Sequence, residues 1–350
     1  MARRVLGSAA AAVDRAATLA VHARNARRTA SIPPPLGVEQ RATVLRGFAA
    51  FYPETLADDF FLPVREIVPV ARAAPNELGV AQALDLSWVS DYQPFLGELR
   101  ERYMRTTQNH SAAVRLLAAE EKRPVAILIH GYMAGQYHVE QRVWPVQRFL
   151  RSGYDVAFFT LPFHGVRANP LRRGPPEFPG ADPRISNEGF RQVIADLRNF
   201  VHWLRAQGHP EVGVMGMSLG GYTAALLATV EAELSFCVPV IPLASLADFA
   251  REQGELSQAP EAEAEEHALL ERIYRVISPL ERAPRIASSR TLVVAAKADR
   301  ITPVAHARKL AAHFGSPLVS WHGGHLLQLG RDACFRRVET LLRELRGKPI

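Results

Sequence analysis

The residues from Gly213 to Tyr222 read GVMGMSLGGY, and this stretch decides the fold. It contains the pattern Gly-x-Ser-x-Gly centred on Ser218, with an apolar run before it and an apolar helical segment, Tyr222–Val230, after it. A serine in this setting lies at the tip of a sharp strand-to-helix turn, and the two glycines are needed because side chains there would collide. The turn exposes the hydroxyl near a helix N-terminus, where the electrostatic potential is positive. We therefore predict that Ser218 is a nucleophile. Because glycine and serine are common, the pattern alone is also compatible with a structural turn, and only its flanks favour the catalytic interpretation.

Short apolar runs recur along the chain on both sides of this turn. They are continuous rather than alternating, which predicts strands buried on both faces, as in a parallel sheet. We expect strands over residues 112–118, 125–129, 156–160, 212–215, 236–241, 291–296 and 318–321. Helices are expected between them, the longest over 187–207, and Thr302-Pro303 is typical of a cap and first-turn pair opening a helix over 304–314. Alternating strands and helices predict an α/β fold with a doubly wound, mostly parallel sheet.

The first part of the chain differs from the rest. Residues 1–110 lack these regular runs and are interrupted by Ser31-Ile32-Pro33-Pro34-Pro35, a stiff extended break. We predict an N-terminal extension over 1–110, partly helical and packed on the core, followed by a catalytic domain over 111–350. Within that domain, residues 166–186 and 243–284 interrupt the alternation, and insertions of this size are typical of lids or of surface loops.

From residue 111 to the C-terminus, 240 of the 350 residues, the chain resembles the α/β-hydrolase superfamily. In pattern it is most similar to bacterial serine esterases and dienelactone-hydrolase-like enzymes. The resemblance implies the chain order serine, acid, histidine. The loop KADRITP after the run 291–296 resembles the acid loop of the family and implies Asp299 as the acid. The segment WHGGHL implies His325, after the glycine pair, as the general base.

Each of these two positions has a rival. Asp248 also follows a predicted strand, and some members of the superfamily carry the acid there, but it lacks the matching loop pattern. His322 is the rival histidine. Without a catalytic role, either aspartate would read as a helix cap or as part of a surface salt bridge, and a lone histidine is more often structural.

An oxyanion hole requires backbone N–H groups aimed at the position where negative charge develops. The residue after the nucleophile, Leu219, is one expected donor. The sequence HGYMAG, residues 130–135, resembles the HGxxxG-like turn of the family and implies the amide of Tyr132 as the second donor. His130 and His164 are expected to be structural.

The resemblance implies hydrolysis of carboxylic esters through a Ser-His-Asp triad and an acyl-enzyme, with a small-molecule ester or thioester as substrate and no cofactor or metal. A thioesterase or acyltransferase on the same triad is an alternative within enzymes. A non-catalytic binding protein that keeps the fold as a scaffold is the alternative outside them.

The net charge of +7 is concentrated at the N-terminus, where residues 1–30 hold six arginines against a single acid, Asp14. Such an arm is compatible with contact with an anionic membrane surface or with self-association, although a solvated helix packed on the domain is the simpler interpretation. No nucleic-acid partner is expected, because a basic face with base-stacking aromatics is missing.

The apolar run from Val5 stops at Asp14 and does not read as an export signal. Only two cysteines, Cys237 and Cys334, are present, and we expect a cytoplasmic protein.

Overall fold

The computed structural model describes residues 7–18, 37–53 and 58–347. Within these residues nine strands form one sheet in the order β1-β2-β3-β5-β4-β6-β7-β8-β9. The strands are β1 (Val70–Ala73), β2 (Gln82–Val89), β3 (Ser111–Ala118), β4 (Val125–Ile129), β5 (Asp155–Phe159), β6 (Val212–Met217), β7 (Cys237–Val240), β8 (Val293–Ala296) and β9 (Leu318–Trp321). Strand β4 pairs parallel with both β5 and β6, and the pairs β6–β7, β7–β8 and β8–β9 are parallel as well. The pairs β1–β2, β2–β3 and β3–β5 are antiparallel. The predicted doubly wound, mostly parallel sheet is confirmed.

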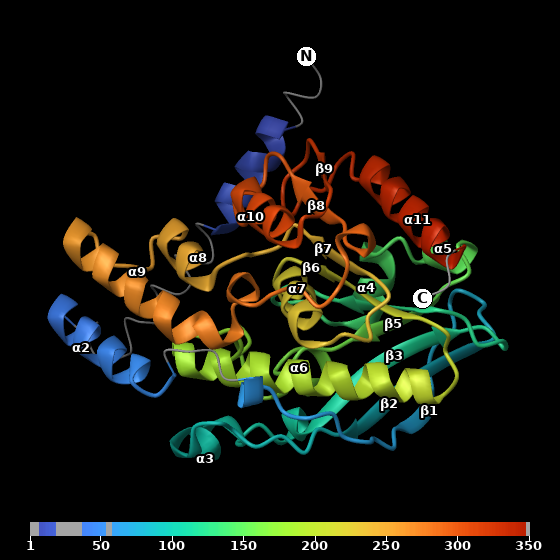
Figure 1. The fold of residues 1–350 in the computed structure, drawn as a ribbon, viewed down its shortest axis with the longest axis horizontal. Coiled ribbons are helices and arrows are strands. Elements are labelled where there is room, and N and C mark those ends of the chain that lie inside the picture. The colour runs from blue at the N-terminus through green and yellow to red at the C-terminus, as the bar shows by residue number, and fades with distance from the viewer. Residues whose placement is uncertain (1–6, 19–36, 54–57, 348–350) are drawn as a thin grey trace.

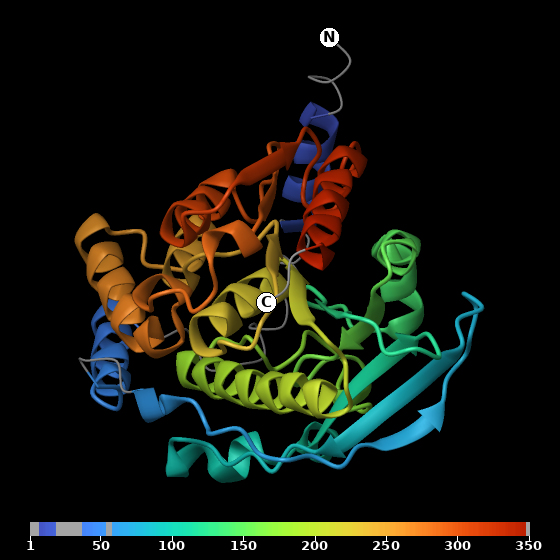
Figure 2. The ribbon, with the colours of Figure 1, turned by 45° about the vertical axis from the view of Figure 1, so that its right-hand side comes forward.

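Helices cover both faces of the sheet (Figures 1 and 2). One apolar core forms around α6, α7 and α10, and a second forms on the other face around α5 and α11. The helices are α2 (Val38–Ala49), α3 (Arg100–Tyr103), α4 (Tyr137–Val143), α5 (Val146–Arg151), α6 (Pro183–Ala206), α7 (Leu219–Val230), α8 (Leu246–Glu252), α9 (Pro260–Tyr274), α10 (Val304–Phe314) and α11 (Asp332–Arg346). Residues 7–18 form a further helix, the deep-blue segment of Figure 1.

The long helix α6 begins four residues before the start expected from its apolar stripe. Asp182 is its N-cap and accepts a hydrogen bond from the backbone N–H of Arg184, while Pro183 occupies the first turn. Proline tolerates that position because the N–H it lacks has no intrahelical partner there. The capping residues therefore set the helix start upstream of the apolar stripe.

Strands β1 and β2 were not expected from the sequence. They lie before residue 111 and extend the sheet through the pairing of β2 with β3 along its full length. The side chains of β1 are all exposed, and those of β2 are buried only in part, so neither strand has the continuous apolar run of a central strand. The sheet thus continues across the predicted boundary at residues 110 and 111, and the division into two domains stays a prediction.

The second candidate lid segment, 243–284, contains α8 and α9. Helix α9 packs against α2, and the Arg46 guanidinium lies 2.6 Å from Oε1 of Glu265. Residues 166–182 are mostly loop and lead into α6. Their roles as lids stay predictions. In the part of the chain that the structure describes, no helix combines the length and apolarity that a membrane crossing requires.

Candidate active site

Ser218 occupies the turn between β6 and α7. Its backbone has φ 56° and ψ −113°, a positive φ that side chains other than glycine seldom adopt and that costs about 1–3 kcal/mol. The strain is held by hydrogen bonds on both sides, from Ser218 N to Val240 O at 2.9 Å and from Tyr222 N to Ser218 O at 3.0 Å. The bond to Val240 links the turn to the neighbouring strand β7, and the bond from Tyr222 is the first of α7, so the serine is held at the carboxyl end of a central strand.

The two glycines of the pattern are required by close backbone approaches. A Cβ at Gly216 would lie 1.9 Å from the carbonyl oxygen of Gly220. A Cβ at Gly220 would lie 2.2 Å from the carbonyl oxygen of Ile129. Because both obstacles are backbone atoms, they cannot move aside as a flexible side chain could.

Asp299 lies in the loop after β8 and is surrounded by donors. Its Oδ1 accepts hydrogen bonds from the backbone N–H groups of Ile301 at 2.9 Å and Thr302 at 2.7 Å. Its Oδ2 lies 2.8 Å from Nδ1 of His325 and 3.0 Å from the Thr302 hydroxyl. The side chain is fully buried. This arrangement favours a carboxylate that accepts the Nδ1–H of His325, which leaves Nε2 as the proton acceptor.

Thr302 is a site residue that the sequence analysis missed. It was expected to cap α10, but the N-cap of that helix is Pro303 and no side chain caps it. The Thr302 hydroxyl instead lies 3.0 Å from Ile241 O and 3.0 Å from His325 Nδ1. A hydroxyl has one proton to donate, so it donates either to Ile241 O or to Oδ2 of Asp299, and in either case its oxygen can accept from Nδ1–H. Only its position three residues after Asp299 could have signalled this role.

The histidine loop lies against the serine turn. The side-chain amide of Gln328 donates to the carbonyl oxygen of His325 at 2.9 Å and contacts the sulfur of Met217, the residue before Ser218, at 3.3 Å. No hydrogen bond links the Ser218 hydroxyl to His325 among the described residues. The structure therefore joins acid and histidine directly, and brings serine and histidine together through their neighbours.

The loop after β4 lies against the same serine. A Cβ at Gly131 would lie 3.5 Å from Cβ of Ser218, so the backbone leading to Tyr132 passes beside the serine turn. The side chain of Tyr132 is exposed. Leu219 is the first residue of α7, and the first N–H groups of a helix have no intrahelical acceptor. Both amides expected to form the oxyanion hole thus belong to segments adjoining Ser218.

His130 anchors this loop. Its Nε2 accepts from the backbone N–H of Leu161 at 3.0 Å, and its Nδ1 lies 2.7 Å from Gly131 O, so the proton resides on Nδ1. Burial, with nearby His164 adding to it, lowers the pKa of His130 to about 3. Burial also lowers the pKa of His164 to about 4. Both imidazoles are neutral at neutral pH and act as hydrogen-bonding supports.

A family model described as the alpha/beta hydrolase family matches residues 126–337, which is more than half of the chain and includes the serine turn, the acid loop and the histidine loop. The chain belongs to the alpha/beta hydrolase family. Two curated relatives, uncharacterized proteins of Mycobacterium tuberculosis strains CDC 1551 / Oshkosh and H37Rv, are each 32% identical over 244 residues, 67% of this chain. The chain spans only 58% of the length of these relatives.

Solved structures of alpha/beta hydrolases share the fold. Acetyl xylan esterase 1 from Thermoanaerobacterium sp. JW/SL YS485 superimposes with a TM-score of 0.57 at 16% identity, covering 89% of this chain and 99% of that one. An acetyl xylan esterase from Paenibacillus sp. R4 gives a TM-score of 0.53 at 17% identity, covering 85% and 92%. At such identities the likeness concerns the fold.

The rival residues of this alpha/beta hydrolase have other partners. Asp248 accepts from Lys309 Nζ at 2.5 Å and lies 3.0 Å from Nε2 of His267. With Glu271, Asp248 and His267 also bring potential metal-ligand atoms within 4.8 Å of one another, and the Asp248 carboxylate is already paired with the Lys309 ammonium. His322 is exposed, in contrast to His325. Neither rival contacts the Asp299–His325 pair through a side-chain hydrogen bond in the described residues.

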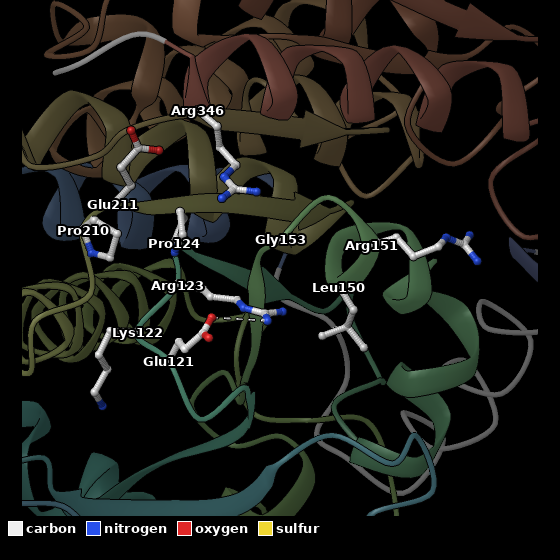
Figure 3. Close-up of a pocket in the computed structure, with 10 residues that line it drawn as sticks. All are labelled: Glu121, Lys122, Arg123, Pro124, Leu150, Arg151, Gly153, Pro210, Glu211 and Arg346. Carbon is white, nitrogen blue, oxygen red and sulfur yellow. Dashed lines mark ion pairs between the residues drawn. The ribbon is translucent and has the colours of Figure 1, made fainter.

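A hollow of about 540 Å³ lies elsewhere on the molecule (Figure 3). Its lining includes Pro124, Gly153 and Glu211, which precede β4, β5 and β6, so it lies at the amino ends of the parallel strands. Ligands of open α/β sheets bind at the opposite, carboxyl ends. None of the site residues lines this hollow, and we assign it no part in the reaction.

Proposed function

We propose that this protein is a serine hydrolase that cleaves carboxylic esters through Ser218, His325 and Asp299. The observation that carries the proposal is the 2.8 Å hydrogen bond between Asp299 Oδ2 and His325 Nδ1, in loops that adjoin the strained serine turn. Two of the similar structures are acetyl xylan esterases, which supports an ester as substrate. No specific observation favours a thioester, an acyl acceptor other than water, or a non-catalytic role.

In this proposal Asp299 holds the imidazole in the tautomer with the proton on Nδ1. Nε2 then accepts the proton of Ser218 Oγ as the oxygen attacks the ester carbonyl carbon, and the resulting imidazolium is stabilised by the carboxylate. The imidazolium gives its proton to the departing alcohol, leaving an acyl-enzyme. Water repeats the sequence and releases the acid. Bonds between nucleophile and base commonly tighten only when substrate is bound, so the serine–histidine bond is expected to form at that stage.

The amides of Leu219 and Tyr132 are proposed to receive the oxyanion. Their support is positional, since one begins α7 and the other lies in the loop whose Gly131 abuts Ser218. Loss of one such donor typically raises the barrier by about 3–4 kcal/mol. Because backbone N–H groups do this work, the side chain of Tyr132 is free to contact substrate.

Three further expectations remain proposals. Segments 166–186 and 243–284 are proposed to cover the substrate. The basic N-terminal arm is proposed to contact a membrane surface or to mediate self-association. Of its six arginines only Arg15 is described, because residues 3, 4, 24, 27 and 28 lie outside the described residues. A cytoplasmic location rests on the sparse cysteines, both of which are buried free thiols.

The test is turnover of a short p-nitrophenyl ester by purified wild type, by Ser218→Ala and by Ser289→Ala, an exposed serine that serves as the control. A fluorophosphonate probe should label wild type at Ser218 and leave Ser218→Ala unlabelled. Products are analysed with and without an added alcohol, because free acid indicates hydrolysis and a new ester indicates acyl transfer. Full activity in Ser218→Ala would show that the proposal is wrong.

A further inference from the structure

The helix over residues 7–18 lies against the loops that carry Asp299 and His325. Figures 1 and 2 show this deep-blue helix beside the orange and red C-terminal segments. Its contact face is made of small residues, with Ala10 and Ala11 buried. A Cβ at Gly7 would lie 3.2 Å from the carbonyl oxygen of His322. Small side chains let the helix backbone approach the histidine loop closely.

Asp14 is the polar residue of this face, and it is completely buried. Its Oδ2 accepts hydrogen bonds from the backbone N–H groups of His325 at 2.8 Å and Arg300 at 3.2 Å. Its Oδ1 accepts from the N–H of Leu326 at 3.0 Å. Burial of a carboxylate is unfavourable unless donors replace the lost water, and here every donor is a backbone amide of one of the two loops. Asp14 thus bridges the histidine loop and the acid loop.

Gly324 provides an independent observation for the same contact. A Cβ at this position would lie 2.6 Å from Oδ2 of Asp14 and 3.1 Å from the carbonyl oxygen of Ala10. A side chain at the residue before His325 would press on Asp14 and on the helix backbone, so glycine there favours the close approach of the helix to the loop. The helix and the histidine loop are thus matched in shape and in hydrogen bonding, although Asp14 and His325 are 311 residues apart in the chain.

We propose that the helix over residues 7–18 is a positioning element of the active site, and that Asp14 fixes His325 relative to Asp299. The inference rests on the proposed function, because it concerns how the histidine of that triad is held. Asp14 bonds to the main chain of His325 and acts through it, without touching the reacting atoms. The family model covers residues 126–337, so this support comes from outside the part of the chain that defines the family.

The first test compares Asp14→Asn with Arg15→Ala. In Asp14→Asn one acceptor oxygen becomes an NH₂ donor that faces a backbone N–H, so at least one of the bonds is lost. A small misplacement of a catalytic group lowers the rate by up to about 100-fold. We expect kcat for a p-nitrophenyl ester to fall about 10- to 100-fold, with KM within about twofold of wild type, because ground-state binding is made elsewhere. Arg15 is exposed on the same helix, and Arg15→Ala should keep the wild-type kcat.

A second variant removes residues 1–18, which should lower kcat at least as much as Asp14→Asn and slow labelling of Ser218 by a fluorophosphonate. Amide hydrogen exchange gives a readout independent of activity: the N–H groups of His325 and Leu326 should lose protection in both variants and not in Arg15→Ala. Far-UV circular dichroism and Tm show whether each variant is folded.

The outcomes separate the two proposals. Wild-type kcat and protection in both Asp14→Asn and the truncated protein would overturn the positioning role. Global unfolding of both variants would also overturn it, because the helix would then serve overall stability. If wild type neither hydrolyses esters nor reacts with the probe, while the His325 amide still loses protection in Asp14→Asn, the proposed function fails and the bridging contact stands.

Discussion

The hydroxyl oxygen of Thr302 lies 3.0 Å from Nδ1 of His325. The same hydroxyl lies 3.0 Å from Oδ2 of Asp299, so the threonine contacts both members of the hydrogen-bonded pair. Its side chain is buried between them and the end of β7, where it reaches Ile241 O. We conclude that acid and imidazole are oriented by a third side chain as well as by each other.

Thr302→Val tests this conclusion, because it keeps the shape of the side chain and removes the hydroxyl. We expect kcat to fall by about tenfold, since the lost hydrogen bonds contribute about 1–1.5 kcal/mol to orientation. Thr302→Ser restores the hydroxyl and should recover most of the rate in steady-state ester hydrolysis. Equal losses in the valine and serine variants would indicate a packing effect in place of a hydrogen-bonding one.

Asp299→Asn separates the proposed acid from its rival. The amide cannot hold the imidazole in the required tautomer, and comparable replacements in serine hydrolases lower kcat by about 10⁴-fold. Asp248→Asn is the matched control, because Asp248 pairs with Lys309 and His267. It should leave kcat near wild type. If the two variants exchange these behaviours in ester hydrolysis, the acid has been assigned to the wrong loop.

Acidification should destabilise the protein through His130 and His164. Burial lowers their pKa values from 6.5 to about 3 and about 4. As the pH falls below 6.5, the unfolded chain binds protons on both residues while the folded protein does not, so the free energy of unfolding decreases toward pH 4. Each histidine contributes up to about 1.4 kcal/mol per pH unit.

Urea unfolding at several pH values measures this slope. His164→Asn should flatten it, because an asparagine amide can still donate to Pro162 O, 2.8 Å from Nδ1, without titrating. His138→Gln replaces an exposed histidine and should leave the slope unchanged. A slope that is equal in all three proteins would mean that His164 titrates normally in the folded state.

Gly220→Ala should destabilise the fold and abolish ester hydrolysis. The new Cβ would lie 2.2 Å from Ile129 O and 2.6 Å from His130 O, both backbone atoms at the point where β4 ends and the loop to Tyr132 begins. Overpacking costs about 1–3 kcal/mol and occasionally more, and an obstacle made of backbone atoms places this variant at the upper end. Gly47→Ala, in α2 with nothing within 4 Å, should instead stabilise by about 0.5–1 kcal/mol. Thermal and urea unfolding of the two variants provide the comparison, and a stable, active Gly220→Ala would refute the steric argument.

The central sheet could be predicted because its strands are marked by their own composition. The runs at 125–129 and 318–321 coincide with β4 and β9, and the apolar stripe of α6 located all but its first turn. Strands β1 and β2 escaped prediction because they lie toward one edge of the sheet, where exposed and partly buried side chains replace a continuous apolar run.

In the candidate site, too, some residues could be predicted from the sequence and others could not. Ser218, Asp299 and His325 stand in short motifs whose local patterns point to them. Thr302 lies within the KADRITP loop but resembles an ordinary helix cap there, and Asp14 is a single acid among arginines, outside any motif. Their roles follow from hydrogen bonds to Asp299, His325 and the backbone amides beside it.

By itself, the sequence determined the strand-turn-helix at Ser218, because the glycines at 216 and 220 and the apolar flanks act over a few residues. Through the resemblance of its motifs to the α/β-hydrolase superfamily, it also predicted the order Ser218, Asp299, His325 for the proposed triad. Only the tertiary structure decided that the helix over residues 7–18 closes onto the histidine loop through Asp14. The physical reason is that the backbone N–H group is the same at almost every position. A carboxylate such as Asp14, which accepts hydrogen bonds from backbone N–H groups, therefore needs no particular type of side chain as its partner, and the sequence carries no sign of the contact.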